Sequence, residues 1–403
     1  METNNKIPIE SRIFGNELKY VKEVLATGFR SSQGSIMMRR LEEAFAKRFN
    51  SKYAISFING TATMHAALEA YGIKPGDEVI VPPLTMSATT FAVLQANATP
   101  VFADIDPDTF QISAESIAER VTSKTRAIIT VSLYGLSPDM DPIMDIAKKH
   151  DLFVIEDNAE CFLGTYKGKM VGTLGDCASF SFQSSKHLTS GEGGMIITDS
   201  LELAEKIRKV QSLGYAGVSA TQGKITKKDI QDPDYSRHVS MGWNYRMPEL
   251  CAAVALAQLE NIDELVSRRI DVANMFNEVV RDFDWFMPQQ TGKDYKNSYW
   301  TWVARLDRTD VSWHQFRDRF IENGGDGIYA AWKLTYLEPM FQTMSLLGRE
   351  QFISLENRNK YKTGLCPSAE KIARRLFQFK TNYWDIKQAE SQAEVLRKTL
   401  QSF

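Results

Sequence analysis

The sequence predicts an α/β protein in which a large domain holds a mostly parallel, seven-stranded sheet between helices. Seven short apolar segments in the first half of the chain resemble strands, and helix-like stretches such as Met140–Lys149 separate most of them. The chain has 403 residues, more than the ~250–300 at which one hydrophobic core stops growing, so a second domain is expected. The seven predicted strands are Tyr53–Phe57, Glu78–Val81, Pro100–Ala103, Ala127–Leu133, Leu152–Ile155, Ala178–Phe182 and Met195–Thr198.

The later elements follow a different pattern. The turn GEGG, residues 191–194, leads into the last of the predicted strands and is short enough for one of the last two to run antiparallel. Met247–Asn277 carries apolar residues at helical spacing and predicts one long helix. Beyond it we expect a strand at Tyr299–Leu306 and helices near Ser312–Asn323 and Ser368–Phe377.

The domain boundary is placed inside the long helix, which is expected to connect the two domains. Residues 1–255 are predicted to form the large domain, with an N-terminal helical arm. Residues 256–403 are predicted to form a smaller C-terminal α/β domain. Hydrophobic residues make up 43% of the chain and charged residues 24%, as in an ordinary globular protein.

The overall composition argues against several classes of protein. A net charge of −2 gives no electrostatic footprint for nucleic acid, and no apolar run approaches the ~18 residues of a membrane helix. The first residues, METNNKIPIE, lack the basic and apolar regions of a secretory signal, so we expect a cytoplasmic protein. Its four cysteines show no CxxC or zinc-like spacing, so we expect reduced thiols and no metal site.

Lys186 is the first candidate for chemistry. It lies in the segment SFQSSKHLTSGEGG, residues 181–194, between a predicted strand and a glycine turn. An amine among such small residues can be desolvated and act as a nucleophile that forms a Schiff base. The commoner alternative is a solvated loop lysine, and this segment alone does not exclude it.

Asp157 is the second candidate, 29 residues before the lysine. It follows the predicted strand Leu152–Ile155, and ligands of open α/β sheets bind outside the carboxyl ends of the strands. Pyridoxal phosphate (PLP) needs an acidic partner that keeps its ring nitrogen protonated. Helix capping is the alternative role for an aspartate after a strand.

A third feature is an anion-binding turn. The strand Tyr53–Phe57 leads into Asn59, Gly60, Thr61 and Ala62, where a helix is expected to begin. Free N–H groups and the positive end of the helix dipole bind anions at such a start. The order of phosphate turn, acid and lysine, each at the end of a strand, carries more weight than any one of them.

With these segments in view, the chain resembles the sugar aminotransferases of PLP fold type I, often called the DegT/StrS family. The resemblance covers nearly the whole length, and the joint order of its motifs is highly specific. They include NGTATMHAAL (59–68), GDEVIVPPLT (76–85), PVFADID (100–106), VIEDNAE (154–160), GDCASFSFQSSKHLTSGEGGMI (175–196), GWNYRMPELCAAVALAQLE (242–260) and CPSAEKI (366–372).

The resemblance implies roles for individual residues. Lys186 would form the Schiff base with PLP, and Asp157 would pair with its pyridine nitrogen. Asn244 would reach the phosphate across the interface of a homodimer with shared active sites, and the apolar helix Leu250–Leu259 would supply part of that interface. The turn and strand residues implied to bind the cofactor and its phosphate are Gly60, Thr61, Ala62 and Ser181.

Two positions depart from the family pattern. Met86 stands where the family often has an aromatic residue over the PLP ring, and a thioether can pack there for about 0.3–1.5 kcal/mol. Glu160 stands where many members have Gln or His. An acid in that place would change the local charge.

The family implies transfer of an amino group from L-glutamate or L-glutamine to a keto- or aldehydo-sugar, for cell-envelope polysaccharide or a secondary metabolite. A PLP-dependent sugar dehydratase on the same scaffold is one alternative, disfavoured because that class carries His in the place of Lys186. A PLP-bound regulatory protein without turnover is the other. Two smaller questions stay open: whether residues 323–339 line the acceptor pocket, and whether His187 shuttles protons or only packs.

Overall fold

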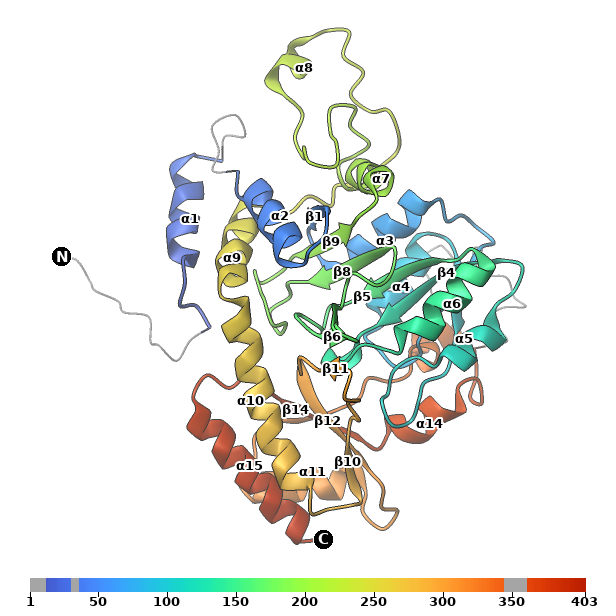
Figure 1. The fold of residues 1–403 in the computed structure, drawn as a ribbon, viewed down its shortest axis with the longest axis vertical. Coiled ribbons are helices and arrows are strands. Elements are labelled where there is room, and N and C mark those ends of the chain that lie inside the picture. The colour runs from blue at the N-terminus through green and yellow to red at the C-terminus, as the bar shows by residue number, and fades with distance from the viewer. Residues whose placement is uncertain (1–11, 30–35, 344–360) are drawn as a thin grey trace, which may run out of the picture.

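The centre of the computed structural model, which describes residues 12–29, 36–343 and 361–403, is a seven-stranded sheet (Figure 1). The strand order is β1-β9-β8-β5-β4-β2-β3. All seven predicted strands are present, each within two residues of its predicted bounds. The strands are β1 (Tyr53–Phe57), β2 (Glu78–Val81), β3 (Thr99–Phe102), β4 (Thr125–Val131), β5 (Phe153–Asp157), β8 (Cys177–Ser181) and β9 (Gly194–Thr198).

Strand direction follows the connections. Neighbouring strands from β3 to β8 are parallel, whereas β9 pairs antiparallel with both β8 and β1. β9 runs antiparallel to β8 in the register Ala178↔Ile197 to Ser181↔Gly194, so the predicted antiparallel strand is confirmed. The carboxyl ends of β1, β5 and β8 therefore meet at one edge of the sheet.

Helices cover both faces of the sheet. The central strand β5 carries apolar side chains on each face, and these need to be buried. Ile155 packs in one core with Leu68, while its neighbour Val154 packs in another core with Ile143. The first core is covered by α3 (Gly60–Tyr71), α4 (Ala88–Gln95) and α7 (Leu201–Gln211), and the second by α5 (Ala114–Arg120) and α6 (Met140–His150). A parallel sheet buried on both faces is the predicted fold.

A third core lies over β8 and β9. It joins these strands to α1 (Glu17–Ala26), α2 (Met37–Arg48) and α9 (Glu249–Glu260), and Figure 1 shows α1 and α9 side by side. The helix predicted at Met247–Asn277 is wrong in one respect: it is broken between α9 and α10 (Ile262–Val280). The Asn261 side chain donates to the carbonyl of Ala257 at 3.0 Å, a local bond that competes with the helix.

The C-terminal part holds a second, antiparallel sheet. Its order is β10-β12-β14-β13, and α10, α11 (Trp313–Glu322) and α15 (Ile386–Gln401) pack with it in one core. The predicted strand and the helix near Ser312–Asn323 are confirmed. The strands are β10 (Phe286–Pro288), β12 (Thr301–Leu306), β13 (Ile328–Ala330) and β14 (Leu376–Lys380).

The helix predicted at Ser368–Phe377 is wrong in its second half. α14 (Pro367–Ala373) ends early, and β14 begins at Leu376. β14 lies between β12 and β13 and hydrogen-bonds to both, so its backbone is satisfied by the sheet and its apolar residues enter the core. Pairing with two distant strands overrides the local helical pattern.

One segment of the C-terminal part packs against the large sheet instead. Tyr336 and Tyr361 contact the ring of Phe102 at the end of β3. Asp104 accepts hydrogen bonds from the N–H groups of Ser368 and Ala369, at 2.8 and 2.9 Å, and so caps α14. The C-terminal part of the chain is therefore joined to the large sheet by these contacts.

The remaining elements are short. They are β6 (Thr165–Tyr166), β7 (Lys169–Met170), β11 (Tyr295–Lys296), α8 (Lys227–Gln231), α12 (Pro339–Thr343) and the 3₁₀ turns Leu133–Gly135 and Thr335–Leu337. All four cysteines are free thiols. In the part of the chain that the structure describes, no helix is both long enough and apolar enough to cross a membrane.

Candidate active site

A cavity of about 490 Å³ lies where β1, β5 and β8 end. Most of the residues predicted to form the site line it, although they come from distant parts of the chain. The lining residues include Gly60, Thr61, Met86, Thr89, Asp157, Glu160, Ser181, Lys186, Trp300 and Trp332.

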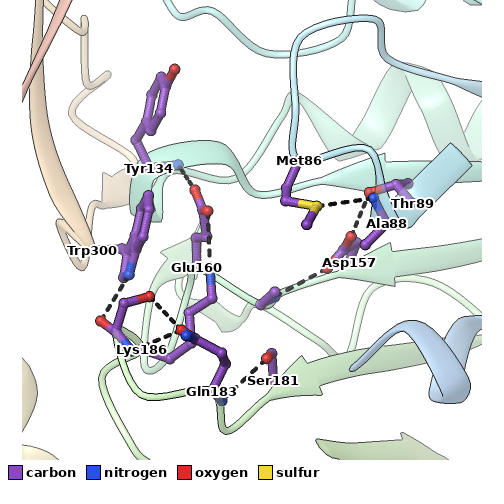
Figure 2. A network of polar contacts seen from close by, with 12 residues as sticks. Met86, Ala88, Thr89, Tyr134, Asp157, Glu160, Ser181, Gln183, Lys186 and Trp300 are labelled. Atoms are coloured by element: carbon purple, nitrogen blue, oxygen red, sulfur yellow. Dashed lines mark hydrogen bonds and ion pairs between the residues drawn. The ribbon is translucent and has the colours of Figure 1, made fainter. Parts of the chain in front are cut away.

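Asp157 is the last residue of β5 and is 4% exposed. Its Oδ2 accepts a hydrogen bond from Thr89 Oγ1 at 2.8 Å, and its Oδ1 accepts one from the N–H of Ala159 at 3.2 Å (Figure 2). Burial raises the pKa of Asp157, and these two donors and Lys186 act against that rise. The carboxylate is thus fixed in direction and still open to the cavity.

The anion-binding turn is built by the start of α3. Asn59 is in extended conformation, and its side chain accepts the N–H of Ala62 at 2.8 Å, which caps the helix. The N–H groups of Gly60 and Thr61 lie in the first turn, where no acceptor exists within the helix. A Cβ on Gly60 would lie 3.1 Å from the Cβ of Ser181, so glycine allows this close approach of turn and strand.

Lys186 is 9% exposed and lies between β8 and β9. Its Nζ is 3.1 Å from Oε1 of Glu160 and 4.2 Å from the ring centroid of Trp300. Figure 2 shows the side chains of Lys186, Glu160 and Trp300 gathered beside the cavity. Lys186 is therefore a buried, paired side chain and not a solvated loop lysine.

Two arginines, the half-buried Arg12 and the buried Arg269, fix the backbone around Lys186. Arg12 donates to the carbonyls of Ser184 and Lys186 at 2.6 and 2.7 Å. Arg269, from α10, donates to the carbonyls of Ser185 and Trp300 at 2.9 and 2.6 Å. Burial lowers the pKa of Arg12 to about 10 and that of Arg269 to about 9. These bonds hold the loop so that the lysine side chain enters the cavity.

Glu160 is as buried as Asp157, at 4% exposure. Its second oxygen, Oε2, accepts the N–H of Tyr134 at 3.0 Å. Tyr134 adopts a left-handed backbone conformation, with φ of 65°, which is rare for a residue with a side chain and is found where the surroundings impose it. The ring of Tyr134 stacks on Trp332, which stacks on Trp300, so one aromatic wall borders the cavity.

Met86 lies at the cavity and is 52% exposed. Its sulfur accepts the N–H of Ala88 at 3.2 Å, which holds the thioether near Asp157 (Figure 2). Met86 and Asp157 therefore line the same cavity.

Two predicted residues do not line the cavity. Ala62 is buried in α3 with its N–H bound to Asn59. Asn244 is exposed, and its backbone forms an isolated β-bridge with Ser212.

His187 is buried, and its Nε2 lies 2.9 Å from the carbonyl of Ser298. Burial holds the pKa of His187 well below its usual range, which favours the packing role over proton transfer.

Other functional residues were not found from the sequence. Thr89, Arg269 and Trp300 are each separated from their partners in the site by more than 60 residues. Residues 323–339, which were one candidate for the lining of the acceptor pocket, supply Trp332 to the cavity. Asp326 does not reach the cavity, because it is bound to Tyr383 and Lys380 instead.

The residues present fit PLP. The cavity combines a buried carboxylate for a ring nitrogen, an N–H-rich helix start for a phosphate, a lysine amine for an aldehyde and a thioether for a ring face. These groups meet at the carboxyl ends of the strands and match what a PLP-dependent enzyme requires.

Comparison with known proteins identifies the family. Residues 12–392 match the DegT/DnrJ/EryC1/StrS aminotransferase family, and the chain belongs to it. It is similar to the GDP-perosamine synthase of Caulobacter vibrioides, with 43% identity over 268 residues, 66% of this chain and 68% of that protein. The GDP-perosamine synthase of Escherichia coli is 38% identical over 317 residues, 78% of this chain and 82% of that protein.

The fold agrees with this assignment. The crystal structure of the aminotransferase from Psychrobacter cryohalolentis superposes with a TM-score of 0.84 and 28% identity, over 96% of each chain. The protein is therefore a sugar aminotransferase, and the predicted family and fold type are confirmed.

Proposed function

We propose that the protein uses PLP to move an amino group from L-glutamate or L-glutamine to the carbonyl of a nucleotide-linked keto- or aldehydo-sugar. The product would be an amino sugar for a cell-envelope polysaccharide or a secondary metabolite. The observation that carries the proposal is the meeting of Lys186, Asp157 and the start of α3 at one cavity. The names of the similar GDP-perosamine synthases support an acceptor carried on a nucleotide.

PLP, when bound, supplies an aldehyde that carries the amino group and a ring that delocalises the electrons of the reacting carbon. Asp157 would hold a proton on the ring nitrogen, and its bonds to Thr89 and Ala159 keep its carboxylate directed at that atom. The N–H groups of Gly60 and Thr61 would bind the phosphate, joined by the hydroxyl of Ser181.

Lys186 has the second role in this account. Its amine would remove the α-proton of the amino donor and return a proton to the cofactor carbon, which requires a mobile side chain on a fixed backbone. The bonds from Arg12 and Arg269 supply the fixed backbone. Trp300 and Trp332 would exclude water on the side of the amine.

The donor half of the reaction gives the first test. With L-glutamate alone, the absorption band of protein-bound PLP is expected to convert to that of the pyridoxamine form, with one equivalent of 2-oxoglutarate released per site. Keto-sugars on GDP and other nucleotides, then added one at a time, should restore the original band only with the true acceptor. Release of ammonia and a deoxy-sugar would instead indicate a dehydratase, and a band unchanged by both donors would indicate a regulatory protein.

We also propose a homodimer with shared active sites. Asn244 is exposed and outside its own cavity, as a residue that serves a neighbouring subunit would be. The apolar side chains of α9 are largely buried against α1 and α2, so this helix offers less interface than its sequence suggested. Exposed apolar residues on and beside α1 are better candidates: Phe14, Leu18, Leu25 and Phe29.

Subunit mixing tests this arrangement. Lys186→Ala and Asn244→Ala are each expected to be nearly inactive, whereas an equal mixture should regain about one quarter of wild-type activity, because each heterodimer of a two-fold assembly keeps one intact site. Exchange is verified with differently tagged subunits. An active monomer in light scattering, or no recovery despite exchange, contradicts the shared site.

A further inference from the structure

Glu160 makes a contact that its neighbour Asp157 does not make. One oxygen of Glu160 lies 3.1 Å from Nζ of Lys186, and the other accepts the N–H of Tyr134 at 3.0 Å. Asp157 instead accepts from Thr89 and Ala159. Asp157, Glu160 and Glu192 all line the cavity, and Glu160 is the carboxylate that forms an ion pair with the lysine.

This ion pair depends on the bonding state of Lys186. A free ammonium has three hydrogens and a full charge, whereas a lysine nitrogen in a Schiff base keeps at most one hydrogen and is drawn toward the cofactor carbon. The pair is buried, with side-chain exposures of 11% for Lys186 and 4% for Glu160, so solvent weakens it little. The contact therefore favours the form of the enzyme in which the lysine is free.

We propose that Glu160 is a positioning residue that receives the ammonium of Lys186 each time this side chain is released from PLP. The inference rests on the proposed function, in which the lysine is alternately bonded and free. When free PLP binds, the ammonium would give one proton to solvent, its nitrogen would bond to the aldehyde carbon, and water would leave. During turnover the nitrogen would bond to the same carbon and displace the amine of the amino compound held there.

The surroundings of Glu160 support this role. Trp300 covers the ammonium at 4.2 Å, so carboxylate and ring together define where the free amine rests. The strained backbone of Tyr134 directs its N–H at Glu160, which leaves the carboxylate oxygen nearer the lysine to accept from Nζ. Burial raises the pKa of Glu160, and the charge of Lys186 acts against that rise.

The test compares two buried carboxylates on the full chain. Glu160→Gln keeps the shape of the side chain and removes its charge. Glu156→Gln is the matched control, because Glu156 is equally buried but accepts hydrogen bonds from the N–H groups of Gly172, Leu174 and Gly175 rather than from Lys186. The apparent dissociation constant of PLP is measured for each protein by titrating the Schiff-base absorption band.

Glu160→Gln is expected to bind PLP about tenfold more tightly, since a charge-assisted hydrogen bond specific to the free lysine is lost. Glu156→Gln should stay within about twofold of wild type, because its bonds do not involve Lys186. Glu160→Asp, which keeps the charge but draws it back by one methylene, should fall between Glu160→Gln and wild type. In thermal unfolding, Glu160→Gln should lose more stability without PLP than with it, a difference that a purely structural role would not produce.

Equal or weaker binding of PLP by a folded Glu160→Gln overturns the inference. So does an equal loss of thermal stability with and without PLP. Absence of any Schiff-base band in the wild type would overturn the proposed function instead, so the two failures are distinguishable.

Discussion

Lys186→Ala is expected to remove amino transfer almost completely while the protein still folds. The lysine is both the nucleophile for the cofactor aldehyde and the base of the reaction, and loss of a positioned base alone costs about 10²–10⁴ in rate. Its Nζ is the group beside Glu160 and Trp300, and no other lysine lines the cavity within the described residues. The measurement is the rate of the half-reaction with L-glutamate under single-turnover conditions.

Stability provides a control for this variant. Removing the lysine leaves the Glu160 carboxylate buried without its cation, which typically costs about 3–5 kcal/mol in the free energy of unfolding. The double variant Lys186→Ala, Glu160→Gln should recover much of that loss but none of the activity. A Lys186→Ala protein with more than a few per cent of the wild-type rate would contradict the assignment.

Asp157→Asn is the second large effect that we expect. The amide keeps the shape of the side chain and one oxygen for Thr89, but it carries no charge to keep a proton on the ring nitrogen. Loss of one preorganised electrostatic partner costs about 10²–10³ in kcat, and we expect at least that. PLP binding itself should persist, because the phosphate turn and Lys186 are unchanged.

The neighbouring Glu156→Gln again serves as control, since Glu156 binds the backbone of residues 172–175 rather than the cavity. It should retain a near-normal kcat even where thermal stability falls. A near-normal rate for Asp157→Asn would show that this acid only caps the turn through Ala159.

Much of the large sheet could be predicted from the sequence, because each strand is an apolar run bounded by turns. The ends of β1, β5 and β8 therefore placed Gly60, Asp157 and Ser181 correctly at one edge. At β14 the prediction was wrong because distant partners decided the structure: this strand forms because β12 and β13 lie on both sides of it. At Asn261 a local bond from the side chain to the carbonyl of Ala257 competes with the predicted helix.

Contacts between residues far apart in the sequence also limit how much of the site could be predicted. Trp300 and Trp332 look like ordinary core aromatics until the fold stacks them beside Lys186. Arg269 lies on a helix with no local sign that it binds the backbone of the catalytic lysine. Glu160 was noted only as a departure from the family, and its ion pair with Lys186 became visible through geometry.

The most direct test of the account is chemical trapping of the lysine. Protein loaded with PLP is reduced with sodium borohydride, digested, and mapped by mass spectrometry. We predict one phosphopyridoxyl group per chain, on the peptide that contains Ser181–Gly194 and at Lys186 within it. A label on another lysine, or no label and no visible chromophore after PLP is supplied, would contradict the central claim that Lys186 carries the cofactor.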